Sequence, residues 1–199
     1  MIVLFAAWLI AGAAGSAAGR GLFELGIAPF WGALLAAVQG LVLWRRGVPY
    51  VRWILWSSVG WLAGVLIAAR LISAAVRAVG AAAPGLGAIP LDLLPTVTVF
   101  SVFGAAQSLV LRPHLPSAFV WVIFSALAGL LMNMVESPIR VLLFAPVEAS
   151  AGVVTAEAVV GGALGAIYGA TMAPLMLQIG PVEAQPADSV TGIRSLRNR

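Results

Sequence analysis

The chain has 199 residues, of which 62% are hydrophobic and only 9% are charged. Because a typical soluble domain carries roughly 25% charged residues, this composition excludes a water-soluble globular fold. The sequence contains no Cys, which excludes disulfides, cysteine-ligated metals and thiol nucleophiles.

Six apolar segments follow one another along the chain, and they leave no room for a soluble catalytic domain. A span of about 20 residues crosses the hydrocarbon layer, and a helix satisfies its own backbone there. The sequence therefore predicts an all-α membrane bundle of about six transmembrane helices built from hairpin repeats, comprising residues 1–177. The predicted segments are 2–19, 26–44, 51–69, 94–111, 118–136 and 150–176.

Two connectors and the C-terminal region depart from this pattern. Arg70, Ser73 and Arg77 share one helical face, which predicts a helix lying along the membrane surface. Ser137 and Pro138 read as an N-cap and a first helical position, which predicts a separate short helix through Phe144. Residues 178–199 lose the apolar periodicity and predict a disordered cytoplasmic tail.

One local pattern occurs twice: a Gln followed by an apolar run, a short basic turn, and then a Trp-x-x-x-Ser helix start. Such a match favours a repeated helical hairpin, with coincidence of composition as the alternative. Gln-to-Ser hydrogen bonds within each hairpin would set the helix register. A polar vestibule for a ligand is the alternative for these residues. The register residues are Gln39 and Ser57 in the first copy, and Gln107 and Ser125 in the second.

Trp8 extends the pattern toward a threefold scheme, because it precedes small residues at the same spacing as Trp53. Trp8, Trp53 and Trp121 recur near one predicted membrane boundary. An indole ring is well accommodated at headgroup level, so we expect all three to anchor the protein in the interface. Stacking against a ligand is the alternative.

Small residues line one face of the first helix and one face of the last. At this spacing they allow helix backbones to approach closely, and we expect packing within the bundle. A docking face for another membrane subunit is the alternative. The two sets are Ala11, Gly15 and Gly19, and Gly161, Gly165 and Gly169.

Glu157 is the acidic residue placed inside an apolar segment, and an intramembrane acid suggests a functional site. We expect it to pair with Arg140 or Arg20 at the interface opposite the termini; a buried role in proton or cation handling is the alternative. Asn133 and Glu136 share a face near the end of the fifth segment and are expected to join this polar cluster.

No catalytic motif accompanies these candidates. His114 stands alone in a turn, so it forms neither a zinc site nor a catalytic triad. We expect no enzymatic activity, no metal and no cofactor. A nucleic-acid partner is also not expected, because the Arg residues lie in short turns and form no basic stripe.

The distribution of Arg residues predicts that both termini are cytoplasmic, in the inner (cell) membrane of a bacterium, with the lipid bilayer as the main partner. The residues predicted on the cytoplasmic side are Arg45, Arg46, Arg52, Arg112, Arg194, Arg197 and Arg199.

With these motifs and the closing Gly165-Ala-Ile-Tyr-Gly169, the chain resembles small repeat-containing bacterial integral membrane proteins of unassigned function. The resemblance covers residues 38–64, 106–132 and 160–172 and implies an architecture without an activity. Pro113-His114 departs from the Arg45-Arg46 turn, which weakens the idea of a repeated basic site.

A structural or accessory membrane component, alone or with other membrane subunits, is the first functional hypothesis. The second is a small-solute or vitamin binding or transport subunit. In length, spans and small-residue first helix the chain is similar to the substrate-binding components of energy-coupling-factor transporters. An intramembrane enzyme is the third, and it would need two reactive groups placed together at one depth.

Overall fold

The computed structural model describes residues 2–24, 31–82 and 93–179, and the regular structure in these ranges is entirely helical. Three of the elements, α5, η2 and α6, follow one another without a break and form one long bent helix, so the fold has six helices. The elements are α1 (Ile2–Glu24), α2 (Trp31–Trp44), α3 (Tyr50–Ala82), α4 (Leu93–Leu111), α5 (Ala118–Ile139), η2 (Arg140–Phe144), α6 (Ala145–Ala151) and α7 (Val153–Met176).

Five of these helices are long and apolar enough to cross a membrane, in the stretches Ile2–Gly21, Tyr50–Ala75, Leu93–Leu111, Ala118–Ala151 and Val153–Met176. The 14-residue helix α2 is apolar but covers only about 21 Å at 1.5 Å per residue. The predicted all-α fold is therefore confirmed, with α2 as a shorter sixth helix. Residues 26–30 of the predicted second span lie outside the described residues.

Apolar side chains cover much of the outer surface of the bundle. Leu55 is 59% exposed, Val51 65% and Phe119 71%. Contiguous apolar surface of this kind is unfavourable in water and suits contact with lipid chains. Length, composition and surface together define a multi-pass membrane protein.

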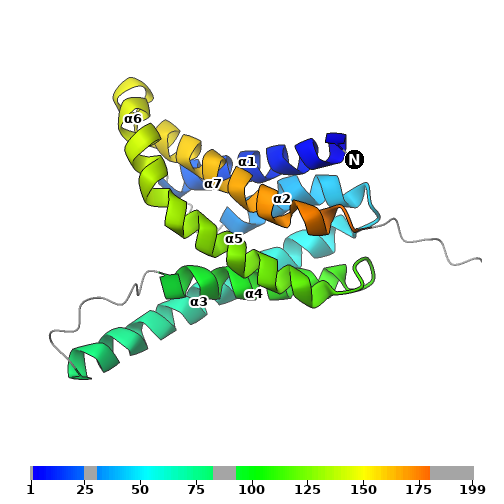
Figure 1. Cartoon of the computed structure of the whole chain (residues 1–199), viewed down its shortest axis with the longest axis horizontal. Helices are drawn as coiled ribbons and strands as arrows, with labels where there is room; N and C mark the ends of the chain where they lie inside the picture. The colour runs from blue at the N-terminus through cyan, green and yellow to red at the C-terminus, as the bar shows by residue number, and fades with distance from the viewer. Residues whose placement is uncertain (1, 25–30, 83–92, 180–199) are drawn as a thin grey trace, which may run out of the picture.

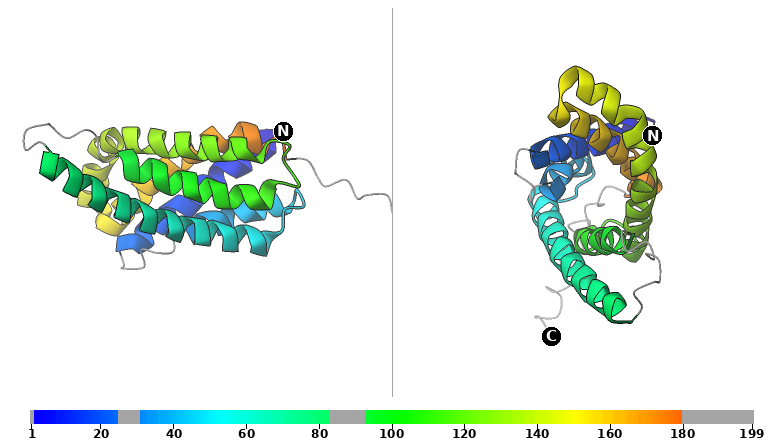
Figure 2. Two further views of the ribbon diagram at one scale, coloured as in Figure 1. Left: turned by 90° about the horizontal axis from the view of Figure 1, so that it is seen from below. Right: turned by 90° about the vertical axis from the view of Figure 1, so that its left-hand side faces the viewer.

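The six helices form a closed ring, because each packs chiefly against two neighbours. The order around the ring is α1, α2, α3, α4, the α5–α6 helix and α7, and α7 packs back onto α1. The right-hand view of Figure 2 looks at this ring from one end. We call that end, which carries α6, the network end, and the opposite end the termini end. The N-terminus, the α2–α3 and α4–α5 turns and the end of α7 lie at the termini end (Figure 1).

The small residues of α1 and α7 are used within the bundle, as predicted. A Cβ atom built on Gly12 would lie 2.5 Å from the carbonyl oxygen of Gly165, and one on Gly161 would lie 2.7 Å from the carbonyl oxygen of Ser16. On α1, a Cβ on Gly15 would lie 2.8 Å from the Cα of Leu35 in α2. These backbones approach so closely that only glycine fits at the contacts.

Trp8, Trp53 and Trp121 fill the ring axis in the half of the bundle toward the termini end. Each is fully buried. The Trp121 ring contacts Trp8 at 6.2 Å and Trp53 at 5.9 Å between centroids, both edge to face, which is a favoured geometry for aromatic pairs. The prediction that these residues anchor the protein in the interface is wrong. Their position along the chain indicated their depth in the membrane but not which side of each helix they occupy.

The register residues also pair differently from the prediction. Gln107 donates from Nε2 to Ser57 Oγ at 3.1 Å, and its Oε1 accepts a bond from Trp121 Nε1 at 2.9 Å. The Gln107 bond thus joins α4 to α3 of the preceding hairpin. Ser125 instead contacts Met172 Sδ at 3.9 Å, and the buried Gln39 amide has no hydrogen-bond partner among the described residues. The predicted Gln39–Ser57 and Gln107–Ser125 bonds are therefore not formed.

Both predicted surface connectors are continuations of long helices. Helix α3 runs unbroken through Arg70 and Ser73 to Ala82. Helix α5 continues through Pro138, and the wider π turn Arg140–Phe144 follows it directly. Proline removes one backbone donor, but within a membrane neighbouring turns can satisfy the freed carbonyl and preserve the helix. The chain then reverses at Gly152, whose φ of +85° is rarely adopted by other residues.

The described chain ends at Ile179, which is buried, and the Ile179 carbonyl accepts a hydrogen bond from Arg46 Nη1 at 3.0 Å. Ile179, the second residue of the predicted tail, thus packs against the turn that follows α2. The rest of that tail, 180–199, lies outside the described residues.

Candidate functional site

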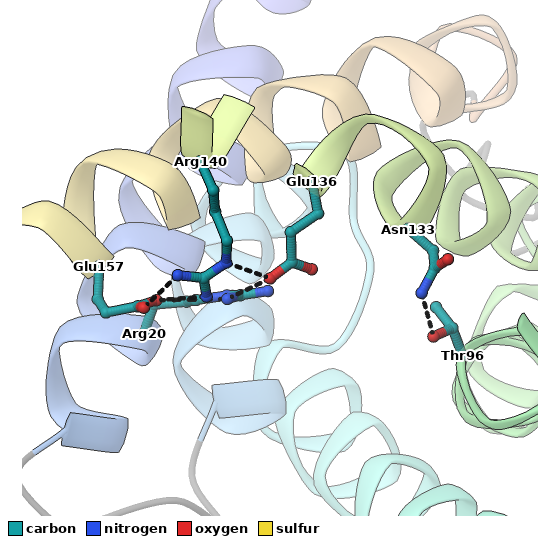
Figure 3. A network of polar contacts seen from close by, with 6 residues as sticks. All are labelled: Arg20, Thr96, Asn133, Glu136, Arg140 and Glu157. Atoms are coloured by element: carbon teal, nitrogen blue, oxygen red, sulfur yellow. Dashed lines mark hydrogen bonds and ion pairs between the residues drawn. The ribbon is translucent and has the colours of Figure 1, made fainter. Parts of the chain in front are cut away.

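Four charged side chains from three helices meet at the network end of the ring (Figure 3). We call Arg20, Glu136, Arg140 and Glu157 the ionic network. Arg140 donates to Glu157 through Nη1 at 2.6 Å and Nη2 at 3.1 Å, and to Glu136 through Nε at 3.1 Å. Arg20 Nη1 lies 2.8 Å from Glu136 Oε1 and 3.3 Å from Glu157 Oε2.

Helix geometry at the bend brings Arg140 into this network. Its backbone N–H points to the carbonyl oxygens of Glu136 and Ser137, and the π turn begins at the same residue. Glu136 lies one helical turn earlier on the same face. The Arg140 guanidinium also lies over the Phe144 ring, 5.3 Å from its centroid, a cation–π geometry that further restricts its orientation. Single π turns of this kind occur often at functional sites.

The network contains two positive and two negative side chains, so its formal charge is zero. The Glu157 side chain is only 9% exposed, and its two oxygens accept three bonds from the two Arg residues. Such pairing compensates for the cost of removing a carboxylate from water. The network also ties together α1, the α5–α6 helix and α7.

Beside the network, inside the ring, lies a pocket of about 690 Å³. All six helices contribute to it, so the pocket is a property of the closed ring rather than of one helical hairpin. Its lining residues are Arg20, Trp31, Trp61, Leu62, Val65, Leu66, Pro95, Thr96, Val99, Phe100, Met132, Asn133, Glu136, Arg140 and Glu157. Mostly apolar walls with a few polar groups are typical of small-molecule sites of this size.

Three aromatic rings form one part of the wall. Trp31 and Trp61 lie 4.3 Å apart between centroids, and Phe100 lies 6.0 Å from each in an edge-to-face arrangement. Phe100 in turn packs 5.6 Å from the buried Tyr168. The Tyr168 hydroxyl lies 3.5 Å from Gln107 Oε1. The aromatic wall is therefore in contact with the packed half of the ring.

The four polar residues proposed from the sequence all line this pocket. Arg140 contacts both Glu136 and Glu157, and Asn133 donates from Nδ2 to Thr96 Oγ1 at 3.2 Å. Glu157 therefore pairs with both of its predicted partners, Arg20 and Arg140.

Sequence reasoning missed the aromatic wall and Thr96. Trp31, Trp61 and Phe100 are apolar residues in apolar helices, so no local signal distinguishes them from lipid-facing residues. Thr96 is different, because it places a hydroxyl in the first turn of α4, directly after Pro95. A polar residue in an apolar helix is a signal that could have been noted. Its partner on α5 could not have been identified from either segment alone.

Within the described residues, no three His, Cys, Asp or Glu side chains are grouped closely enough to hold a metal ion. Comparison of the chain with known protein families, curated proteins and solved structures gives no match. The fold and the site thus define a class by themselves: a multi-pass helical membrane protein whose ring of six helices surrounds a mostly apolar pocket with a charge-balanced polar end.

Proposed function

We propose that this protein is a non-catalytic membrane component that binds a small molecule, as the substrate-binding subunit of a transport system does. One observation carries this proposal. A pocket of about 690 Å³ is lined by residues of all six helices and combines apolar walls with polar groups at one end. That volume is within the range of pockets that bind small organic ligands.

The alternative role as a structural or accessory subunit loses one of its supports. A docking face for another subunit was the alternative interpretation of the small residues on α1 and α7. Gly12 and Gly15 instead contact α7 and α2 of the same chain, respectively. These faces are therefore already covered within the ring.

A binding role also fits the state of the two carboxylates. Glu157 and Glu136 are both held by Arg20 and Arg140. These ion pairs are well suited to fix the shape of a pocket wall. We infer that the network positions the site and performs no bond-breaking step.

For the orientation, we propose that both termini face the cytoplasm of a bacterial cell. Arg45, Arg46, Arg52 and Arg112 all belong to the turns at the termini end and the first turn of α3. An excess of Arg in short loops favours the cytoplasmic side. The pocket would then lie toward the outer side, where a binding subunit for uptake meets its solute.

Native mass spectrometry of protein purified in a mild detergent tests the proposal, because it reports bound small molecules and bound subunits together. We expect a ligand-sized mass on the wild-type protein. Val65→Trp should remove it, because Val65 lines the pocket and a larger side chain would occupy part of the volume.

Val59→Trp is the matched control. Val59 lies on the same helix with similar exposure, 55% against 42%, but does not line the pocket. It should retain the bound mass. A ligand-free wild-type protein that also binds no compound from a metabolite extract would overturn the proposed binding function, and so would a bound mass that survives Val65→Trp.

A further inference from the structure

The polar residues at one end of the pocket differ in which of their hydrogen-bonding atoms are already used. This difference bears on the kind of ligand that the pocket can bind. Arg140 commits all three of its guanidinium nitrogens to Glu136 and Glu157. Glu136 accepts its bonds through Oε1, and its Oε2 accepts none from the described residues; in Figure 3 no dashed line joins this oxygen to the other residues drawn. The pocket therefore presents an unused carboxylate oxygen beside an arginine whose three nitrogens each already donate to a carboxylate.

Asn133 adds a second acceptor on the same helix. Its amide nitrogen donates to Thr96, and its Oδ1 accepts no bond from the described residues. Asn133 and Glu136 are three positions apart on α5, so the two acceptors lie on one face, and both residues line the pocket. A ligand with hydrogen-bond donors or a positive charge would satisfy both.

The aromatic wall favours the same kind of ligand. Trp31, Trp61 and Phe100 line the pocket and pack against one another at centroid distances of 4.3–6.0 Å. The faces of aromatic rings carry partial negative charge and attract cations, and groups of such rings recognise substituted ammonium ions. An anion would instead lie beside the Glu136 carboxylate and the ring faces, and the N–H groups that Arg20 and Arg140 retain belong to guanidinium groups already paired with Glu136 and Glu157.

We propose that the pocket binds an organic cation, an apolar or aromatic body carrying one protonated or quaternary amine, with the amine between Glu136 and the aromatic wall. This inference rests on the proposed binding function and adds the chemical class of the ligand. The proposed ligand class does not follow from the pocket volume or from the zero formal charge of the network. It rests on the unused acceptors and on the aromatic rings.

Isothermal titration calorimetry in an uncharged maltoside detergent tests the inference with three probes of similar size. These are benzyltrimethylammonium, the neutral N-benzylacetamide and the anion phenylmethanesulfonate. We expect the cation to bind about tenfold more tightly than the neutral probe, and the sulfonate to bind most weakly. Protein-free micelles provide the baseline for each probe.

Two substitutions assign the effect to the site. Glu136→Gln should weaken binding of the cation about tenfold and leave the neutral probe unchanged. Glu148→Gln removes the same charge from an exposed position on α6 outside the pocket and should change neither. If Glu136→Gln does not purify as a folded protein, Trp61→Leu replaces it, and Trp61→Phe, which retains an aromatic face, should restore most of the affinity.

The outcomes separate the ligand class from the binding function. Tighter binding of the sulfonate, or equal binding of all three probes, would overturn the cation class while leaving a binding pocket. Equal loss of cation affinity in Glu136→Gln and Glu148→Gln would also overturn it, because it would indicate a general charge effect. If none of the probes binds, the cation class fails; the binding function fails as well only if native mass spectrometry finds no bound molecule.

Discussion

Arg140 and Glu157 form a two-pronged ion pair that joins the bend after α5 to the first turns of α7, with both guanidinium Nη atoms on the two carboxylate oxygens. The pair closes the ring beside the pocket, and Arg20 of α1 reaches the same carboxylate. The polar end of the pocket thus depends on contacts between segments that are adjacent in space because the helix reverses at Gly152.

Glu157→Gln should destabilise the protein by about 1.5–3 kcal/mol, because it weakens three charge-assisted hydrogen bonds and leaves two arginines with less compensation. Unfolding in detergent, followed by circular dichroism, measures this change. Combining Glu157→Gln with Arg140→Gln should cost less than the sum of the two single changes, since each removes the same pair. Strict additivity would show that the pair is not coupled.

The contact between α1 and α7 gives a prediction with an internal control. A Cβ on Gly165 would collide with the carbonyl oxygen of Gly12, whereas one on Gly162 would meet only Ala17 Cβ at 3.6 Å and Ala13 O at 3.8 Å. Gly165→Ala should therefore cost about 1–3 kcal/mol through overpacking, and Gly162→Ala should be neutral or stabilising. Thermal unfolding of the two variants compares them directly. Equal melting temperatures would contradict the close approach of these helices.

Gln39 and Gln107, which hold the same place in the predicted repeat, should respond differently to the same substitution. Gln107→Leu leaves Trp121 Nε1 and Ser57 Oγ without their partner and should cost about 1–3 kcal/mol. Gln39→Leu removes a buried amide that has no partner among the described residues, so it should be nearly neutral or stabilising. Chemical unfolding of both variants in one detergent checks this order, and a larger loss for Gln39→Leu would refute it.

The helices could be predicted from the sequence because about 20 consecutive apolar residues have few alternatives in a membrane. Pairing of Glu157 with Arg140 and Arg20 could be predicted too, since buried charges require partners. The predicted hydrogen bonds that are not formed depended on how the helices are arranged around the ring. Ser57 bonds to Gln107 and not to Gln39 because α3 packs against both α2 and α4 in the ring.

Two other predictions were wrong because the residue types involved occur in more than one kind of structural position. Ser137-Pro138 carries the sequence signature of a helix start, yet within an apolar helix the π turn that follows accommodates the proline and the helix continues. Trp8, Trp53 and Trp121 have the amphipathic rings typical of the interface, but here they fill the space along the ring axis. The identity of a residue alone does not distinguish these positions.

Labelling of single introduced cysteines tests the central claim, that the pocket lies at the network end of the ring while the half toward the termini end is packed. The chain has no Cys of its own, so each variant carries one reactive thiol. Met132→Cys lies in the pocket, Ser125→Cys lies about two turns away on the same helix at a fully buried position, and Ser117→Cys marks the exposed α4–α5 turn.

With a membrane-impermeant maleimide applied to right-side-out and inside-out vesicles, we expect Met132→Cys to react only from the side opposite to Ser117→Cys. We expect Ser125→Cys to react from neither side. Reaction of Met132→Cys from the same side as Ser117→Cys, or labelling of Ser125→Cys as fast as Met132→Cys, would contradict a pocket that lies at the network end of the ring.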